Sequence, residues 1–430
     1  GHACAVLDDT TVSCWGTDGV SIDATWDAPT VIESEPGVSL TGVAEVCTGT
    51  NYTCARLEST GKVLCWGVGT EGQLGTGGAV DNPTPSPVVL IGVTELTGVT
   101  QIACGRTTTC AVMSDSRVRC WGENAKHQLG IGTTTVQQTT ALVPVKTDLF
   151  GTDLEGVARV SAGGFHTCAI TTVTDGAGGD VYCWGNNGWG ALGAGVLPVE
   201  MVGLAMKVEG VTGAVDVAVG GQGYGTQQSC VVLVDGTMRC WGANNSGLLA
   251  NGQVSAVSLV PRKIEALNDV IVHEVATSSS TACALTDVGT FCWGSIHGGR
   301  CGLPTGGHQV GLAMAWLGAP SAVDPPLPSV TIGTGEPLPF GHIAGALENE
   351  TRLGLDADGH VWFSGFTNAG FCAAAQPGGP VTLGGMGLLH DNALDEPIGP
   401  FTSLARGSHH ACGVTEDQRV ECWGQNDGGM

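Results

Sequence analysis

Alternating apolar and polar positions recur along this chain in one two-run unit. In Cys110–Gly122, CAVMSDSRVRCWG, two short alternating runs flank a polar turn, with a cysteine in each run and Trp-Gly at the end. Period-two runs joined by a turn predict a β-hairpin. The same unit starts again at Cys4, Cys54, Cys168, Cys230, Cys283 and Cys412, and a degenerate copy, LGLDADGHVWFSG, starts at Leu353. Eight copies of one unit indicate a repeat architecture.

The segments around each hairpin predict two further strands per repeat. A run of small and β-branched residues precedes the hairpin, as in VARVSAGG at 157–164, and suits a tightly packed inner strand. A glycine-rich turn follows the hairpin, and then a short run near a proline that suits an outer edge strand. About four antiparallel strands per repeat predict an all-β fold, a β-propeller of seven or eight blades.

We expect residues 1–430 to form a single propeller domain, because repeat arrays build one body without internal boundaries. The interval 302–349 is longer than other inter-hairpin segments and rich in proline, with APSAVDPPLPSV at its centre. It predicts an extended loop between the sixth and seventh repeats.

Fourteen of the 18 cysteines fall in pairs at one position of the repeat: Cys4 with Cys14, Cys54 with Cys65, Cys110 with Cys120, Cys168 with Cys183, Cys230 with Cys240, Cys283 with Cys292, and Cys412 with Cys422. Directly opposed residues on antiparallel strands lie at Cα distances of about 4.5–5.5 Å, within disulfide range. Zinc knuckles are the competing interpretation, but they need C-x2-C pairs and the chain has none. In the degenerate copy both partners are replaced together, by Leu353 and Phe363, as a cross-strand bridge predicts.

The other four cysteines predict bonds between neighbouring blades. Cys47 and Cys104 precede successive hairpins and are offset by one residue, so they project from opposite faces of their strands. Two stacked sheets need that arrangement for a bond between them. Cys301 and Cys372 each lie seven residues after the closing glycine of their repeat. They form the second predicted inter-blade pair, with unpaired buried thiols as the alternative.

The predicted disulfides limit the cellular location of the protein, and its net charge limits the kinds of partner that it can bind. A disulfide-rich chain predicts an oxidising location, which is extracellular, on the cell surface or periplasmic. With 16 Lys and Arg against 40 Asp and Glu the formal charge is −24, which disfavours binding to nucleic acid. No apolar run reaches the roughly 18 residues of a membrane helix, so we expect no membrane insertion.

Candidate chemistry is sparse, and we expect no catalytic residue, metal, cofactor or small-molecule substrate. Gly67-x-Gly69-x-x-Gly72 matches a dinucleotide fingerprint in letters, but no helix is expected after it. His273-Glu274 lacks the second histidine of a zinc protease motif, and Asp235, Asp356 and Asp358 suit hairpin turns better than calcium. His2, His166 and His410 recur at one repeat position, which predicts structural hydrogen bonds. Trp26, Trp189 and Trp316 lie outside the repeat register and are the candidate contact aromatics.

The unit G-x-x-H-x-C-A-L, a turn, and V-x-C-W-G-x-N-x-x-G-Q-L-G-x-G resembles the regulator of chromosome condensation (RCC1) repeat in its cysteine-containing bacterial form. The signature is nearly intact at Gly67–Gly77 and Gly122–Gly132. The resemblance implies a propeller whose face binds protein. We therefore expect a secreted, disulfide-stabilised protein-binding or structural scaffold, with self-assembly as a variant of that role. The alternative is a propeller enzyme, a lyase or glycosidase, with its site at the central channel.

Overall fold

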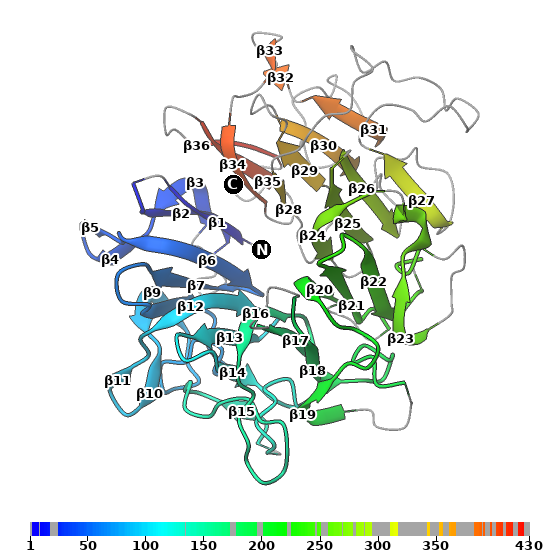
Figure 1. Ribbon diagram of the computed structural model, residues 1–430. Helices are drawn as coiled ribbons and strands as arrows, with labels where there is room; N and C mark the ends of the chain where they lie inside the picture. Colours follow the sequence, from blue (N-terminus) through cyan, green and yellow to red (C-terminus); the bar gives the residue numbers. More distant parts are fainter. Residues whose placement is uncertain are drawn as a thin grey trace.

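Antiparallel sheets arranged around a ring make up this computed structural model (Figure 1). The backbone is described within residues 2–7, 9–17, 25–133, 135–172, 178–195, 201–221, 225–245, 247–250, 257–268, 270–277, 281–287 and 289–294, and so are the side chains of these residues except 3, 15–17, 25–29, 201, 289, 290 and 292. Beyond residue 294 only strand backbones are described, from β27 (Val310–Trp316) to β36 (Val420–Gly424).

Eight sheets form the blades, each a meander in chain order. The first four comprise β1 (His2–Val6), β2 (Val12–Thr17) and β3 (Thr25–Val31); β6 (Val43–Gly49), β7 (Tyr52–Leu57), β8 (Val63–Gly67) and β9 (Asn82–Pro87); β12 (Val99–Cys104), β13 (Thr108–Met113), β14 (Val118–Glu123) and β15 (Gln137–Gln138); and β16 (Val157–Ala162), β17 (His166–Thr171), β18 (Val181–Asn186) and β19 (Met201–Lys207). The next four comprise β20 (Ala214–Gly220), β21 (Gln228–Leu233), β22 (Met238–Gly242) and β23 (Ser258–Lys263); β24 (Val272–Thr277), β25 (Thr281–Thr286), β26 (Gly289–Gly294) and β27; β28 (His342–Ala344), β29 (Arg352–Leu355), β30 (Val361–Phe366) and β31 (Thr382–Leu388); and β34 (Phe401–Arg406), β35 (His410–Thr415) and β36.

Small elements lie outside the blades: the hairpins β4 (Glu33–Glu35) with β5 (Val38–Ser39), β10 (Val89–Ile91) with β11 (Thr94–Glu95), and β32 (His390–Asp391) with β33 (Glu396–Pro397), and one 3-10 turn at Glu265–Leu267. The last sheet adjoins the first, since β34 contacts β1 and β36 contacts β3 (Figure 1). The first sheet begins at the second strand of the repeat and the last ends at the third. The predicted all-β propeller is confirmed, with eight sheets in the described part of the chain.

The predicted loop 302–349 was wrong in part. Within that interval β27 pairs with β26 as the outer strand of the sixth sheet, and β28 pairs with β29 as the inner strand of the seventh. The two strands consist mainly of small and apolar residues, VGLAMAW and HIA. The proline-rich stretch between them favoured a loop prediction for the whole interval. The segment between the two strands lies outside the described residues.

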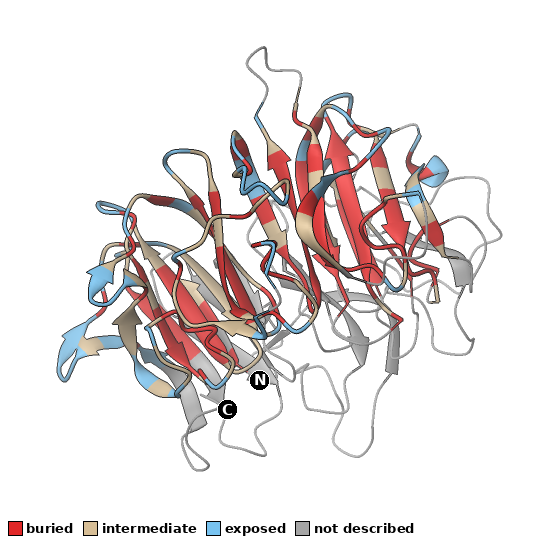
Figure 2. Ribbon diagram, turned by 90° about the horizontal axis from the view of Figure 1, so that it is seen from below, coloured by how far each residue is buried: buried red, intermediate tan, exposed pale blue. Residues whose placement is uncertain are grey.

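The hydrophobic core is divided among the blade interfaces. One cluster joins Cys110, Val118 and Cys120 of the third sheet to Val160 and Trp184 of the fourth. Equivalent clusters join the first and second, second and third, fourth and fifth, and fifth and sixth sheets. Figure 2 shows the buried residues running along the strands and the exposed residues gathering in the loops. Each blade therefore buries its apolar faces only against its neighbours.

Candidate functional site

A disulfide crosses the central hairpin in each of the first five repeats. The bonds are Cys4–Cys14, Cys54–Cys65, Cys110–Cys120, Cys168–Cys183 and Cys230–Cys240, each with a Cα separation of 4.1 Å. In the sixth repeat Cys283 is also disulfide-bonded, and it lies opposite Cys292. In the eighth, Cys412 lies opposite Cys422, and in the degenerate seventh Leu353 lies opposite Phe363. These are the positions that the sequence pattern pairs, and we call these bonds the hairpin rungs.

The tryptophan of the Trp-Gly step joins two blades in the third, fourth, fifth and sixth repeats. Trp184 Nε1 donates to the backbone carbonyl of Gln128 in the preceding repeat at 2.8 Å, and Thr167 Oγ1 donates to the same carbonyl at 3.2 Å. Gly130 follows at φ +67°, where an added Cβ would lie 2.7 Å from Trp184 Cδ1. The indole of the next blade therefore packs on the backbone of the Gln-Leu-Gly turn.

The same indole bond recurs around the ring, from Trp121 to Gln73 (2.9 Å), Trp241 to Ala191 (2.7 Å) and Trp293 to Leu248 (2.7 Å). Gly67-x-Gly69-x-x-Gly72 lies in the turn that leads into Gln73, and no helix follows it among the described residues. The glycine fingerprint thus belongs to the joint between blades, as its repetition predicts.

A second joint runs along the inner strands through one polar side chain per blade. Glu45, Gln101, Arg159, Asp216 and Glu274 occupy one position, immediately after a register shift in β6, β12, β16, β20 and β24. We call the first four of these side chains, Glu45, Gln101, Arg159 and Asp216, the polar girdle. Each of these four contacts the next blade. The bonds are Ile102 N to Glu45 Oε2 (3.1 Å), Val160 N to Gln101 Oε1 (2.9 Å), Gln101 Nε2 to Val160 O (3.0 Å), the ion pair of Arg159 with Asp216, and Val275 N to Asp216 Oδ2 (3.0 Å).

The charged side chains of the girdle accept backbone hydrogen bonds or form an ion pair in these contacts. Burial raises the pKa of Glu45, and the Arg56 guanidinium, 3.0 Å away, opposes that shift. Among the described residues no group of three or more His, Cys, Asp or Glu is placed to bind a metal. Sequence reasoning missed the girdle, although a polar residue two positions after the first apolar residue of β6, β12, β16, β20 and β24 was the signal that could have revealed it.

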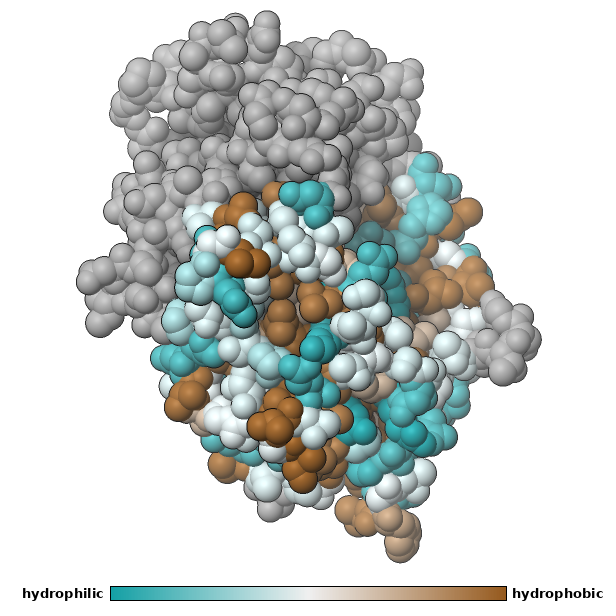
Figure 3. Space-filling view, turned by 90° about the vertical axis from the view of Figure 1, so that its left-hand side faces the viewer, coloured by the Kyte–Doolittle hydropathy of each residue, from teal (hydrophilic) through white to brown (hydrophobic). Residues whose placement is uncertain are grey.

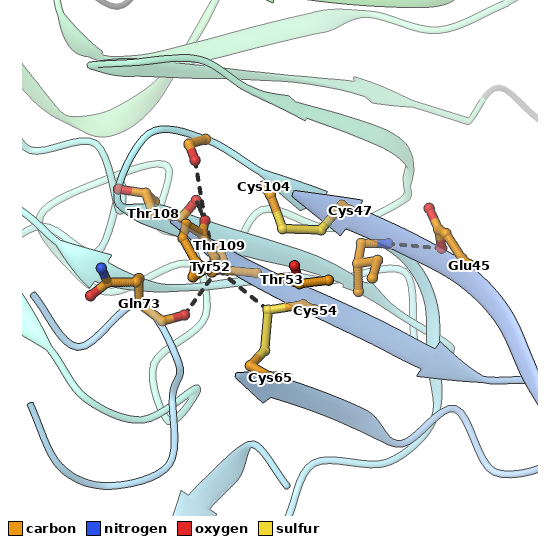
Figure 4. Close-up of a disulfide and its surroundings, with 12 residues drawn as sticks. Glu45, Cys47, Tyr52, Thr53, Cys54, Cys65, Gln73, Cys104, Thr108 and Thr109 are labelled. Atoms are coloured by element: carbon orange, nitrogen blue, oxygen red, sulfur yellow. Dashed lines mark hydrogen bonds between the residues drawn. A yellow bond between two sulfur atoms is a disulfide. The ribbon is translucent and has the colours of Figure 1, made fainter. Parts of the chain in front are cut away.

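One disulfide links neighbouring blades directly. Cys47 of β6 bonds Cys104 of β12, the pair that the one-residue offset predicts, with a Cα separation of 5.5 Å. Figure 4 shows this bond above the Cys54–Cys65 rung. Cys47 and Cys104 are half-buried, whereas Cys54 and Cys65 are fully buried. Cys301 and Cys372, the second predicted pair, lie outside the described residues.

The recurring histidines form structural hydrogen bonds between blades. His166 Nε2 lies 2.9 Å from Ser229 Oγ, and His2 Nε2 lies 2.6 Å from Thr53 Oγ1. Full burial lowers the pKa of His166 to about 4, so its ring is neutral at pH 7. Tyr52 takes the same position in the second repeat and donates to the carbonyl of Thr108 at 2.9 Å (Figure 4). The side chain of His410 lies outside the described residues.

The remaining candidates are not brought together. Trp189 is half-buried, and its ring lies 3.4 Å from the Cβ position of Gly225. Trp26 and Trp316 lie in β3 and β27, where only the backbone is described. Asp235 accepts from Thr237 N at 2.9 Å and from Thr237 Oγ1 at 2.7 Å, the local turn bonding that the sequence predicts. Across the part of the chain that the structure describes, no helix is long and apolar enough to cross a membrane.

Comparison with known proteins agrees with this geometry. The regulator of chromosome condensation (RCC1) repeat model matches residues 60–112 and 115–170, and a second RCC1 repeat model matches 99–128. The ultraviolet-B receptor UVR8 of Arabidopsis thaliana is 30% identical over 311 residues, which are 70% of this chain and 65% of that receptor. The chain thus spans slightly less than two thirds of this relative.

Two solved structures show the same fold. Human WBSCR16 superposes with a TM-score of 0.62 and 18% identity, over 99% of this chain and 98% of that one. Prp20p from Saccharomyces cerevisiae, described with its binding to Gsp1p and histones, gives a TM-score of 0.51 and 21% identity over 64% of each chain. The chain therefore carries regulator of chromosome condensation (RCC1) repeats, and its fold is similar to the propellers built from that repeat.

Proposed function

We propose that this chain is a disulfide-stabilised propeller that works outside the cytoplasm as a protein-binding scaffold. The observation that carries the proposal is the buried rung in every one of the first five repeats. Bonds of this kind persist where the surroundings are oxidising. Prp20p, which shares this fold, binds other proteins, Gsp1p and histones, and this supports a binding role here.

The rungs have a physical reason in this composition. The chain has 70 glycines and only 5% aromatic residues, so each blade has little apolar surface to bury. Closing a hairpin loop of about ten residues contributes roughly 2.5–3 kcal/mol in the chain-entropy model. A rung in each hairpin therefore offsets the conformational entropy of a glycine-rich sheet, and the sheet can present its loops in fixed positions.

The test has two arms. In the first, thiols in the native host are blocked before lysis, and the cysteines are mapped by mass with and without reduction. We expect the chain in the extracytoplasmic fraction with Cys110–Cys120 and its equivalents oxidised. Finding the chain in the cytoplasm with its rung cysteines reduced would refute the proposed location outside the cytoplasm.

The second arm measures binding. The oxidised chain, immobilised, is exposed to native extracytoplasmic fluid, and a captured protein is then purified and titrated against the chain in solution. A saturable complex of fixed stoichiometry supports the scaffold. If the chain instead elutes as a larger species whose size falls on dilution, it assembles with itself, and the bound partner is a second copy.

A further inference from the structure

The most exposed large apolar side chains are concentrated in one part of the described molecule. Phe150 is 98% exposed, Val93 93% and Leu149 84%, and Val136, Ile91 and Val80 follow in rank. All six lie between residues 80 and 150: Ile91 is in β10, and the others are in loops and turns beside the outer strands of the second and third sheets. Apolar side chains scattered singly need no explanation, but such a concentration marks an interaction site.

Backbone hydrogen bonds join these outer segments. Ala141 N donates to the carbonyl of Val89 at 2.9 Å, and Gly77 N donates to the carbonyl of Thr139 at 2.8 Å. The segment that leads into Leu149 and Phe150 is thereby fixed against the β10–β11 hairpin that carries Ile91 and Val93. We call the six side chains the apolar edge. Figure 3 shows apolar residues standing among polar ones on this side of the molecule, with an apolar projection at the lower end.

The tip at Leu149 and Phe150 is held rigidly by its own turn. Thr147 N donates to the carbonyl of Thr152 at 2.9 Å. The Asp148 carboxylate accepts from Phe150 N at 2.9 Å, Thr152 N at 3.0 Å and Thr152 Oγ1 at 2.6 Å. Because this backbone is already ordered, covering the two side chains loses little backbone conformational entropy, which favours their use as anchors.

The turn itself does not require apolar residues. The outer hairpin of the fourth repeat also turns on a glycine of positive φ, Gly210, with open space around it like Gly151. There the residue before the glycine is Glu209, a charged residue. Leu149 and Phe150 are 84% and 98% exposed, so they bury little apolar surface within this chain and contribute little to its fold.

The charge beside the tip indicates what kind of surface fits. Asp115, Asp148, Asp153 and Glu155 outnumber the two nearby cations, Arg117 and Lys146. Both cations are engaged in ion pairs: Arg117 with Asp115, Asp153 and Glu155, and Lys146 with Asp153. The whole chain carries −24, so a second copy is repelled, whereas a basic surface is attracted.

We propose that the apolar edge docks a basic, apolar segment of a partner protein, with Phe150 and Leu149 as its anchors. The partner's apolar side chains cover the edge, and its Lys and Arg residues face Asp148, Glu155 and their neighbours. This proposal rests on the proposed function as a protein-binding scaffold and assigns the surface that performs it.

A random 12-residue phage-displayed peptide library tests the proposal on the full-length oxidised chain. We expect enriched peptides that combine aromatic or aliphatic residues with Lys or Arg. Their Kd should weaken at least about 30-fold in Leu149→Ser/Phe150→Ser, the loss typical of hot-spot residues. The control Glu209→Ser, at the equivalent turn of the fourth repeat, should leave Kd within about twofold. Circular dichroism and Tm should match in all three proteins, because the substituted side chains are exposed.

Three outcomes overturn the proposal. Peptides or native partners that bind wild type and the double variant equally place binding elsewhere and leave the scaffold function standing. A failure to enrich any peptide removes the edge as a peptide-docking surface. Sedimentation that shows a wild-type dimer, lost in Leu149→Ser/Phe150→Ser, assigns the edge to a second copy of this chain instead.

Discussion

Val219 donates its backbone N–H to Ser161 Oγ across the interface of the fourth and fifth blades, at 3.2 Å. Ser161 and Val219 occupy the inner-strand positions that Cys47 and Cys104 hold at the interface of the second and third blades. The close approach of these two positions is therefore a property of the repeat, and the covalent bond is an addition at one interface.

That equivalence predicts a disulfide between the third and fourth blades. Ala103 and Ala162 occupy the corresponding positions, and Ala103→Cys/Ala162→Cys should oxidise without distorting either strand. The new bond closes a loop of about 60 residues, which raises the free energy of unfolding by up to about 4 kcal/mol in the chain-entropy model. Mass mapping and denaturant titration give the readout. The matched control Ala103→Cys/Ser161→Cys places the second thiol on the opposite face and should stay unbridged; a bridge there would contradict the register.

The Trp184 indole packs directly on Gly130, so adding a single methyl group at this residue should destabilise the fold. In Gly130→Ala the new Cβ meets the Trp184 ring at less than 3 Å, in a backbone conformation that already disfavours alanine. We expect a loss of about 3 kcal/mol or more in unfolding free energy, from strain and displaced packing together. Gly151→Ala is the control: its φ is also positive, at +91°, but nothing lies within 4 Å. Its cost should stay near 1 kcal/mol, and equal losses in both variants would show that the indole contact is unimportant.

The hairpins, the rungs and the propeller could be predicted because each is a local pattern repeated along the chain. Alternation gives the strands, and cysteines in opposed positions give the bonds, as in Cys110 and Cys120. Even the Cys47–Cys104 bond followed from a one-residue offset, since side-chain direction alternates along a strand.

The polar girdle and the apolar edge depend on which residues of different blades meet. Asp216 is an ordinary acidic residue in the sequence, and only the stacking of β16, β20 and β24 gives it two partners. Leu149 and Phe150 look like one more apolar pair, because exposure is set by the tertiary fold. The strands β27 and β28 were missed since their short apolar runs flank a proline-rich stretch that carries a strong loop signal.

Acidic pH should weaken the fold through His166. In the unfolded chain this residue is protonated with a pKa near 6.5, whereas in the folded chain its pKa is about 4. The unfolded state therefore holds more protons between these values, and stability falls as pH drops through that window, by up to about 3 kcal/mol. His166→Gln removes the titration and imitates Gln228 at the same position of the fifth repeat. Urea titrations from pH 7.5 to 4 should show a flatter pH dependence in the variant, and parallel curves would refute the assignment.

Asp216 joins three consecutive blades, so its removal should break contacts at two blade interfaces. Asp216→Ala leaves Val275 N–H without an acceptor and Arg159 without its ion pair, and we expect a loss of about 2–3 kcal/mol in unfolding free energy. Asp216→Asn keeps an acceptor for Val275 and should lose about half as much. Arg159→Ala should cost more than Asp216→Asn, because it leaves the buried Asp216 carboxylate charged and without its ion pair, whereas Asp216→Asn removes that charge. Chemical denaturation of the three variants gives the order, and an equal loss in all would assign the effect to the ion pair alone.

The inter-blade disulfide should be the first to open under mild reduction. A thiolate must reach a sulfur to exchange with it, and Cys47 and Cys104 are half-buried whereas the rung cysteines, such as Cys110 and Cys120, are buried in the blade interfaces. In a time course with a dilute reductant, alkylation at Cys47 and Cys104 should precede alkylation at the described rungs, and the hairpins should stay closed while the fold persists. Cys47→Ser/Cys104→Ser provides the control: its rungs should react at the wild-type rate if they open only with global unfolding. Rungs that open before Cys47–Cys104 would show that access does not set the order, and that the blades themselves open locally.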